Sequence, residues 1–442
     1  MPLPFGVMGR GFGRMGAART KGVGGGVLRI ATNRGEIPTT VTLAGANSLR
    51  AETRKFVKFG NADLEYIQLG YAGFYSASGL EVNAGNDQSI QAAIEGISGG
   101  SPGVVRVTFD GGNSVGTIVD GVALYLSDRL YASAFGLTKF PKNTTFFVRE
   151  QRDVALGKNH TRCSSIASMT GERTYLSDGQ SASQLMSTGA MSQPTGGSGP
   201  ARMMGPTVII GKSVGATEVA VIGIGDSIMA GSNDTSAPNG NDGSAGGGFV
   251  QRGLYSVNGR TIPFLQMGVS GTKAMDFVTS YAKRAAYFRY ATHLLENFGT
   301  NDFVDSARTA AQVYADRQTI WAAFKAAAQG AKRVEAFPIL PRTNSTDSWA
   351  TLANQTPRTG YAASSGTFRD PMNANLATAL SGGLIDGIID LNAAIADVGS
   401  PDKWIVTGAA NFATSDGTHP SPATSASPYL AAAVATRAAT WA

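Results

Sequence analysis

The sequence predicts a multidomain protein, with an N-terminal β-sandwich or jelly-roll-like domain followed by an α/β domain of three layers. The chain of 442 residues is long enough for two or three domains. Its first half contains many short strand-like segments without intervening amphipathic helices, which favours antiparallel β structure. Its second half alternates strand-like and helix-like segments, which indicates a parallel sheet with right-handed crossovers. We therefore expect a tail at 1–26, a β-rich accessory domain at 27–215, with glycan binding as one role for it, and an α/β domain at 216–442.

Residues 1–26 are rich in glycine and basic, and the first acidic residue of the chain is Glu36. A segment of this composition buries too little apolar surface to fold alone, which predicts a solvated terminus. The alternative is an anchoring peptide that orders against neighbouring subunits, because glycines permit close approach and arginines pair with carboxylates. This second interpretation predicts a homo-oligomer or assembly into a particle through residues 1–26. The basic residues of the tail are Arg10, Arg14, Arg19 and Lys21.

The first half has five segments with the apolar or alternating pattern of strands, bounded by Gly, Asn, Asp or Pro. They are Val27–Thr32, Thr39–Leu43, Val104–Phe109, Val122–Leu126 and Thr144–Arg149. One short helix is predicted at Gln88–Ile97, a long loop or linker at Ser177–Gly205, and a last strand at Thr207–Ile210. An aromatic cluster fits either stacking on sugar rings or packing within the core. Its members are Tyr66, Tyr71, Phe74 and Tyr75.

The second half has five apolar segments that alternate with helical patterns. The predicted strands are Glu218–Ile224, Pro263–Met267, Leu294–Phe298, Val334–Leu340 and Ile385–Leu391. The predicted helices are Phe249–Tyr255, Ala274–Tyr290, Ala307–Ala331, Asn373–Leu380 and Pro428–Trp441. Ala307–Ala331 has the most regular pattern, with apolar residues at near-helical spacing and no proline.

Composition excludes several classes of protein. Charged residues make up only 15% of the chain, and the net charge of +6 permits an anionic partner without indicating nucleic acid. Cys163 is the only cysteine, which excludes internal disulfides and cysteine-based metal sites. The sequence contains no uncharged apolar run of about 18 residues, so we expect no membrane span. The first ten residues lack the apolar core of a secretory signal, and we expect a protein that is cytosolic, processed, or associated with a virion or other particle and released by lysis.

The strongest chemical signal lies where an apolar strand ends in Gly-Asp-Ser, at residues 225–227. In an open α/β sheet, ligands bind beyond the carboxyl ends of the strands, where Ser227 is expected. The alternative is that Ser227 is only the N-cap of a helix. Three further blocks follow in order: Gly271 in Gly-Val-Ser-Gly-Thr, Asn301 in Gly-Thr-Asn-Asp, and Asp416 with His419 in Asp-Gly-Thr-His-Pro.

A serine hydroxyl is a poor nucleophile until a base removes its proton, and His419 is the candidate base. Asp416 lies three residues before it across a Gly-containing turn, so its carboxylate is expected to orient the imidazole and stabilise the imidazolium. The other histidines, His160 and His293, lie outside the four blocks, and three histidines in all argue against a zinc site. We expect neither a metal nor a cofactor.

The four blocks together resemble the SGNH (GDSL) hydrolase family, over the C-terminal half of the chain only. The resemblance implies a flavodoxin-like three-layer domain and a serine esterase. It also implies an oxyanion hole made of the backbone N–H groups of Ser227 and Gly271 and the side-chain amide of Asn301. Without the resemblance, Gly271 fits an ordinary turn, and Asn301 fits an Asx-turn or an N-cap.

Two polar stretches are expected to wall the pocket. Gly231–Gly248 follows the serine block, and Arg342–Trp349 follows the fourth predicted strand of the second half. The first stretch has almost no large apolar side chains, unlike the apolar lid of a lipase. We expect Asn233, Asp234 and Arg342 to bind substrate. The first stretch also contains Asn239, Asn241 and Asp242, but its spacing does not match a calcium loop.

These observations favour a serine esterase that removes short acyl groups, with acetyl preferred, from a polysaccharide or other glycan ester. The alternative is a structural or receptor-binding component of a phage tail or similar particle, in which the hydrolase fold serves mainly to bind glycan. The layout of a β-rich domain before a hydrolase domain is an analogy at the level of the fold and does not identify the substrate.

Overall fold

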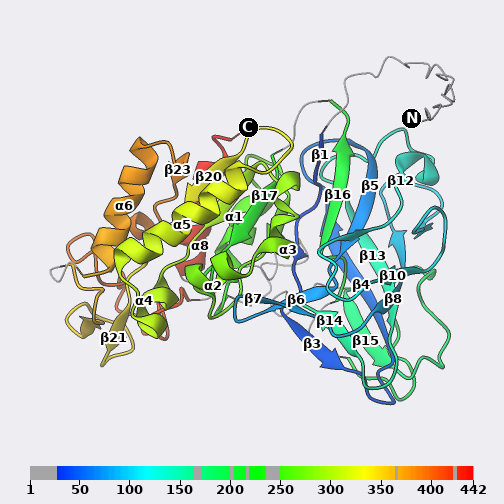
Figure 1. Cartoon of the computed structure of the whole chain (residues 1–442), viewed down its shortest axis with the longest axis horizontal. Coiled ribbons are helices and arrows are strands. Elements are labelled where there is room, and N and C mark those ends of the chain that lie inside the picture. The colour runs from blue at the N-terminus through cyan, green and yellow to red at the C-terminus, as the bar shows by residue number, and fades with distance from the viewer. Residues whose placement is uncertain are drawn as a thin grey trace, which may run out of the picture.

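The computed structural model describes residues 27–163, 171–199, 204–215, 219–234, 248–363, 367–421 and 426–441. Figure 1 shows the strands of the first half beside the helix-covered sheet of the second half. The tail at 1–26 lies outside the described residues, and its two interpretations stay predictions. Within the described residues, no helix is long and apolar enough to cross a membrane.

The first half is built mainly from two antiparallel sheets. One sheet has the order β1-β16-β5-β11, with β12 also paired to β5. The other has the order β10-β8-β13-β4-β15, with β9 also paired to β8. The first sheet contains β1 (Leu28–Ile30), β5 (Leu64–Tyr71), β11 (Tyr125–Leu126), β12 (Leu130–Tyr131) and β16 (Val208–Ser213). The second contains β4 (Arg50–Lys58), β8 (Gln88–Glu95), β9 (Val104–Val107), β10 (Gly116–Ile118), β13 (Thr145–Asp153) and β15 (Arg173–Ser177).

The two sheets share one apolar core, to which Leu69 of β5 and Ile94 and Val148 of β8 and β13 contribute. The prediction of antiparallel β structure is confirmed in this coarse form, and a jelly-roll connection stays a prediction. Two antiparallel two-stranded pairs and one 3-10 turn complete the described part of this half: β3 (Thr40–Leu43) with β14 (Asn159–Arg162), the hairpin of β6 (Phe74–Ala77) with β7 (Leu80–Asn83), and η1 (Ala132–Phe135).

The predicted helix at Gln88–Ile97 is wrong, because this segment forms strand β8. Ile90, Ile94 and Ile97 have a spacing that suits a helix, but β8 lies between β13 and β10 and buries Ile90 and Ile94 completely. Tertiary packing therefore overrides the local pattern. In the aromatic cluster, Tyr71 and Phe74 are fully buried, which supports core packing over sugar stacking for these two rings.

The second half contains a six-stranded parallel sheet with the order β2-β18-β17-β19-β20-β23. Its strands are β2 (Gly35–Glu36), β17 (Val221–Ile224), β18 (Phe264–Gln266), β19 (His293–Glu296), β20 (Arg333–Ala336) and β23 (Gly387–Ile388). The edge strand β2 comes from the part of the chain that otherwise builds the antiparallel sheets. The domain boundary near residue 215 stays a prediction, although β2, which precedes this boundary in the sequence, pairs with β18, which follows it.

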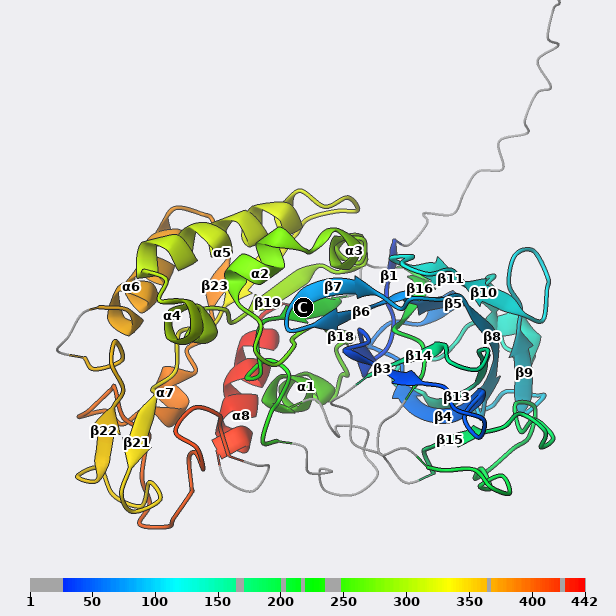
Figure 2. The same ribbon diagram turned by 60° about the horizontal axis from the view of Figure 1, so that its bottom comes forward.

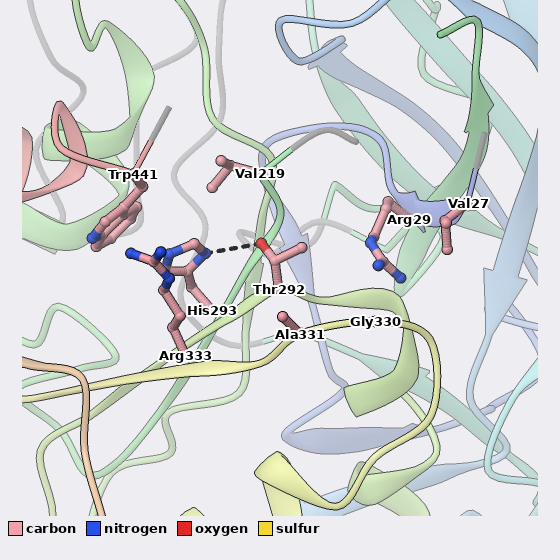
Figure 3. A pocket seen from close by; sticks show the side chains of 9 residues that line it. All are labelled: Val27, Arg29, Val219, Thr292, His293, Gly330, Ala331, Arg333 and Trp441. Atoms are coloured by element: carbon pink, nitrogen blue, oxygen red, sulfur yellow. Dashed lines mark hydrogen bonds between the residues drawn. The ribbon is translucent and has the colours of Figure 1, made fainter. Parts of the chain in front are cut away.

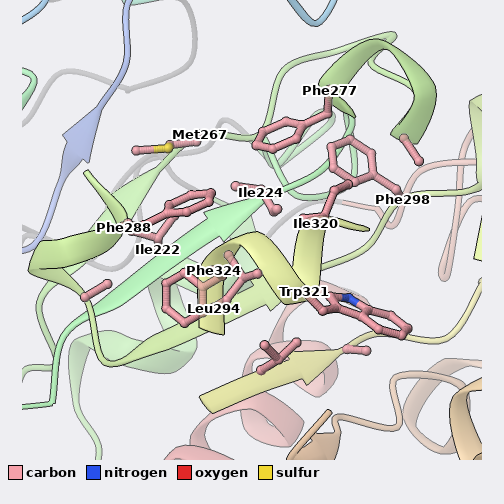
Figure 4. Close-up of a cluster of buried hydrophobic side chains, with 14 of the residues drawn as sticks. Ile222, Ile224, Met267, Phe277, Phe288, Leu294, Phe298, Ile320, Trp321 and Phe324 are labelled. Atoms are coloured by element: carbon pink, nitrogen blue, oxygen red, sulfur yellow. The ribbon is translucent and has the colours of Figure 1, made fainter. Parts of the chain in front are cut away.

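Helices cover both faces of this sheet. Ile222 of β17 belongs to the apolar cluster that contains Trp321 on one face (Figure 4). Val221 belongs to the cluster that contains Leu430 on the other face, which explains why the strand is apolar at successive positions. The first face carries α2 (Ala274–Thr279), α3 (Ala282–Ala285), η2 (Phe288–Tyr290), α5 (Ala310–Lys325) and α6 (Arg369–Ser381). The second carries α1 (Gly248–Tyr255), α7 (Asn392–Ile395) and α8 (Ala426–Ala438). The remaining elements are α4 (Thr300–Ser306), β21 (Thr343–Ser345) and β22 (Gln355–Pro357).

Two predicted helices of the second half differ from the structure. The segment predicted as one helix, Ala274–Tyr290, is broken into α2, α3 and η2, and the backbone leaves the helical conformation at Ser280, with φ −145° and ψ 75°. Arg284 binds the carbonyl of Ser280 and the carboxylate of Glu81 in β7. The predicted helix at Ala307–Ala331 is shorter in the structure, since α5 begins at Ala310, with Thr309 as the N-cap of a capping box with Gln312, and ends at Lys325. The β6–β7 hairpin thus packs against the helices of the second half (Figure 2).

Candidate active site

The turn after β17 presents Ser227 at the carboxyl edge of the parallel sheet. Gly225 has φ +157°, and a Cβ atom there would lie 1.5 Å from Oδ1 of Asn297. Glycine is therefore required for Asn297 to reach the turn. Nδ2 of Asn297 donates to Oδ1 of Asp226 at 3.0 Å, and the backbone N–H of Ile228 donates to the same oxygen at 2.8 Å. These bonds fix the backbone on both sides of Ser227.

Ser227, His419 and Asp416 form one hydrogen-bonded line. Oγ of Ser227 lies 2.7 Å from Nε2 of His419, and Nδ1 of His419 lies 2.7 Å from Oδ2 of Asp416. The backbone N–H groups of Thr418 and His419 both donate to Oδ1 of Asp416 at 2.8 Å. The residues after Ser227 form turns rather than a helix, so the N-cap interpretation has no helix to cap in this part of the described chain.

Burial opposes ionisation of Asp416, but the hydrogen bonds from His419 and Thr418 outweigh it and hold the pKa of this carboxyl well below its usual range. Asp416 is therefore a carboxylate throughout the pH range in which an esterase works. An ionised carboxylate at Nδ1 stabilises a protonated imidazole and keeps the neutral ring in the tautomer whose Nε2 faces Ser227.

The Gly271 and Asn301 blocks lie beside the serine turn. Val269 donates its backbone N–H to the carbonyl of Gly225 at 3.0 Å, which joins the segment after β18 to the turn after β17. Gly271 has φ +77°. Nδ2 of Asn301 donates to the carbonyl of Thr272 at 3.2 Å. The structure thus brings the predicted oxyanion residues to one edge of the sheet.

The backbone N–H groups of Ser227 and Gly271 have no hydrogen-bond acceptor among the described residues. Free N–H groups at this edge are what an oxyanion hole requires. Asn301 lies inside the first turn of α4, whose N-cap is Gly299, so the N-cap interpretation of Asn301 is wrong. The assignment of the three donors stays a prediction.

Sequence reasoning missed two residues that support the site. Asn297 directly follows β19 and binds the carboxylate of Asp226. Asp302 accepts hydrogen bonds from the backbone N–H groups of Ala274 and Met275 at 2.9 and 3.3 Å. Burial raises the pKa of Asp302 and that of Asp226 to about 6. Polar residues directly after an apolar strand were the available signal for Asn297.

The three predicted substrate-binding residues have different environments. Asn233 is exposed, and its Nδ2 donates to Oδ2 of Asp416 at 3.2 Å. Asp234 faces inward, because it forms an ion pair with Arg252 at 2.7 Å and accepts the hydroxyl of Ser427, and it is only 3% exposed. Its burial argues against the predicted role in substrate binding. Asn239, Asn241 and Asp242 lie outside the described residues.

The second predicted wall is attached to the catalytic turn. The backbone N–H of Thr343 donates to the carbonyl of Gly417 at 3.1 Å, and Nε1 of Trp349 donates to Oγ1 of Thr343 at 2.8 Å. A Cβ atom at Gly417, where φ is +74°, would lie 1.9 Å from the carbonyl oxygen of Thr343. The wall and the Asp416–His419 turn therefore pack as one unit. Arg342, which precedes this strand, is half-buried.

The remaining histidines lie away from the site. His160 is buried in β14, and burial lowers its pKa to about 4. His293 begins β19 and stacks on Trp441 with ring centroids 4.4 Å apart. It lines a cavity of about 340 Å³ at the amino ends of the parallel strands, the opposite edge from Ser227 (Figure 3). In the described part of the chain, no group of three His, Cys, Asp or Glu side chains is arranged to hold a metal ion.

The family model described as GDSL-like Lipase/Acylhydrolase matches residues 221–427. No curated protein matches the sequence. Three solved structures illustrate the similarity. A carbohydrate esterase family 3 protein from Talaromyces cellulolyticus is 17% identical, with 50% of this chain and 97% of that chain covered and a TM-score of 0.32. The M. smegmatis aryl esterase is 14% identical, with 51% of this chain and 100% of that chain covered and a TM-score of 0.34. A family two carbohydrate esterase from Clostridium thermocellum is 11% identical, with 91% of this chain and 97% of that chain covered and a TM-score of 0.33. Because the identities and TM-scores of these structures are low, the family of the C-terminal half is assigned from the family model alone.

Proposed function

Because the C-terminal half of the chain belongs to the GDSL-like lipase/acylhydrolase family and is a carboxylic-ester hydrolase, we propose that it removes short acyl groups, acetyl in particular, from a polysaccharide. Ser227 is the nucleophile, His419 the general base and Asp416 the residue that orients His419. The observation that carries this proposal is the hydrogen-bonded line through these three side chains, with 2.7 Å at each step.

The geometry supports a two-step acyl transfer. As Oγ of Ser227 attacks the ester carbonyl, Nε2 of His419 accepts its proton across the 2.7 Å contact, and Asp416 stabilises the imidazolium. The backbone N–H groups of Ser227 and Gly271 and the amide of Asn301 stabilise the developing oxyanion. His419 then protonates the leaving alkoxide, and a water activated by the same imidazole releases the acid from the acyl-serine.

The polar surroundings of Ser227 support a short acyl group. The described residues nearest to the line of three side chains include Asn233 and Arg358, which contact Asp416 through its carboxylate and its carbonyl. Such groups suit sugar hydroxyls and offer little apolar surface. Each buried methylene contributes about 0.8 kcal/mol, so a pocket built for fatty chains gains rate as the acyl chain lengthens.

The test compares kcat/KM for acetate, butyrate and octanoate esters of one alcohol and measures acetate release from acetylated polysaccharides. We expect acetate to be the best of the three and acetate to be released from at least one glycan, with neither reaction in Ser227→Ala. A preference for octanoate without release of acetate from any glycan would contradict the substrate class and leave the assignment of Ser227 intact. No observation on the described residues favours the alternative of a phage-tail component.

A further inference from the structure

Two arginines without an acidic partner lie side by side next to the proposed catalytic residues. Arg342 immediately precedes β21 and Arg358 immediately follows β22. The backbone N–H of Arg358 donates to the carbonyl of Arg342 at 2.8 Å, so the two residues are opposite each other at the open end of this hairpin. Both side chains are half-buried.

Each guanidinium is tied to a different part of the site. Nη2 of Arg358 donates to the main-chain carbonyl of Asp416 at 3.1 Å, and its Nε donates to Oδ1 of Asn344 at 3.0 Å. The positive charge of Arg342 opposes the rise in the pKa that burial causes at the hydroxyl of Tyr361. That hydroxyl donates to the carbonyl of Thr300, the residue before Asn301. The two positive charges therefore extend from the Asp416 turn toward the predicted oxyanion hole.

The charges of this pair are not neutralised within the described residues. Neither arginine forms an ion pair there, and the carboxylate of Asp416 is already committed to His419 and to the backbone N–H groups of Thr418 and His419. Burial, followed by the charge of Arg342, lowers the pKa of Arg358. Nε and Nη1 of Arg342 are buried without a hydrogen-bond partner in the part of the chain that the structure describes. Buried donors in this state are costly unless a ligand satisfies them.

We propose that Arg342 and Arg358 form a subsite for an anionic group of the substrate, so that the esterase acts on an O-acylated acidic sugar, a hexuronate in particular. This inference rests on the proposed function. A guanidinium presents parallel N–H donors that match the two oxygens of a carboxylate, which is the charged group that a uronic acid carries at C6. A sulfate ester on a neutral sugar offers the same kind of acceptor.

The experiment uses three acetylated sugars that differ only at C6: O-acetyl galacturonate, O-acetyl galactose and O-acetyl galactose 6-sulfate. The readout is kcat/KM for each charged sugar divided by kcat/KM for the neutral one. We expect a ratio well above one for the galacturonate ester of the wild type. We expect it to fall about 10- to 100-fold in Arg342→Gln and Arg358→Gln, the loss typical of a charged hydrogen-bond partner. Arg342→Lys retains the positive charge but not the parallel N–H donors, so its ratio of kcat/KM values is expected to lie between those of the wild type and Arg342→Gln.

Arg173→Gln is the matched control, because Arg173 is an exposed arginine of β15 whose side chain, among the described residues, hydrogen-bonds only to the carbonyl of Glu172. Its ratio should equal that of the wild type. If the two arginines only support the Asp416 turn, all esters will lose rate equally and the ratio will not change, which would overturn the subsite. A ratio near one for both charged sugars in the wild type would overturn it as well. A preference for the sulfated sugar alone would refute the hexuronate.

A binding measurement separates this inference from the proposed function. Calorimetric titration of the Ser227→Ala protein with galacturonate and with galactose needs no turnover. Tighter binding of galacturonate that is lost in Ser227→Ala/Arg342→Gln supports the subsite, even if no sugar ester is cleaved and the esterase function fails. Equal binding of the two sugars, together with active cleavage of the neutral ester, overturns the subsite and leaves the esterase function standing.

Discussion

Asn297 and Asp226 hold each other through two hydrogen bonds at the end of β17. Nδ2 of Asn297 donates to Oδ1 of Asp226 at 3.0 Å, and the backbone N–H of Asp226 donates to Oδ1 of Asn297 at 3.3 Å. Asp226 is fully buried, and Asn297 is 6% exposed. The pair joins the ends of two neighbouring parallel strands directly beneath Ser227, so the position of the nucleophile depends on a contact that no substrate touches.

Gly225→Ala should disrupt this pair, because the added Cβ would overlap Oδ1 of Asn297. We expect a loss of more than about 3 kcal/mol in the free energy of unfolding, measured by chemical denaturation. Gly111→Ala is the control, since Gly111 also has a positive φ, +82°, but no atom near its Cβ position, and should cost only about 1–2 kcal/mol. The double variant Gly225→Ala/Asn297→Ala should recover part of the loss. Equal losses in the two glycine variants would contradict the steric argument.

Asp226 should make folding stability depend on pH in the acidic range. Burial raises its pKa to about 6, above the value near 3.9 of an unfolded chain, although Ile228 and Asn297 donate hydrogen bonds to it. The native state therefore binds the proton more tightly than the unfolded state, and this contribution is present below about pH 4 and is lost as the pH rises through 6. Relative to Asp226→Asn, the wild type should lose roughly 2–3 kcal/mol between pH 4 and pH 7. Denaturation curves of the two proteins that run parallel across this range would refute the prediction.

Ser227→Ala should abolish ester hydrolysis, with a loss of roughly 10⁴- to 10⁶-fold in kcat, because Oγ of Ser227 is the hydroxyl that lies at Nε2 of His419. A fluorophosphonate should label Ser227, as mass spectrometry of the digested protein will show. Ser232→Ala is the matched control, since Ser232 follows five residues later and its hydroxyl, within the described ranges, hydrogen-bonds only to that of Ser270, at 3.2 Å. Retained labelling in Ser227→Ala would remove this serine from the mechanism.

Asp416→Asn should lower kcat by about 10⁴-fold on an activated ester while the protein still folds, because an amide at this position favours the wrong tautomer of His419 and cannot balance its charge. The measurement is steady-state kinetics with circular dichroism on the same samples. Asp390→Asn is the control, because Asp390 is an exposed carboxylate whose one hydrogen bond to another described residue comes from the backbone N–H of Ala393. Turnover within a few-fold of wild type in Asp416→Asn would mean that His419 functions without this partner.

The parallel sheet and the blocks at its carboxyl edge were readable from the sequence because both signals are local. Strand β17 is apolar at successive positions, and Asp416 and His419 lie three residues apart in one turn. Strands β4 and β5 were not predicted, and β4 shows the reason. It carries Arg54, which is buried in an ion pair with Glu95 of β8 at 2.8 Å. A buried charge with a distant partner looks like a surface residue in the sequence alone.

The same limitation explains why Asp234 was predicted to bind substrate although it is buried. Asp234 lies in a polar stretch and reads as solvent-exposed, but its partners Arg252 and Ser427 are brought to it by α1 and α8. Strand β2 was hidden for another reason. It is only two residues long, and its partner β18 follows about 230 residues later in the chain, so no periodicity reveals the pairing.

Because β2 lies early in the chain, it is synthesised long before the strand with which it pairs. Gly35 and Glu36 are translated before all of the antiparallel sheets have formed, whereas β18, with which they pair, is made only after the serine block. During that interval the growing chain carries one strand of the hydrolase sheet without its neighbour. The hydrolase sheet can therefore be completed only after β18 has been translated, and β18 then pairs with a segment that the hydrogen bond from Glu36 to the carbonyl of Thr207 joins to the first half.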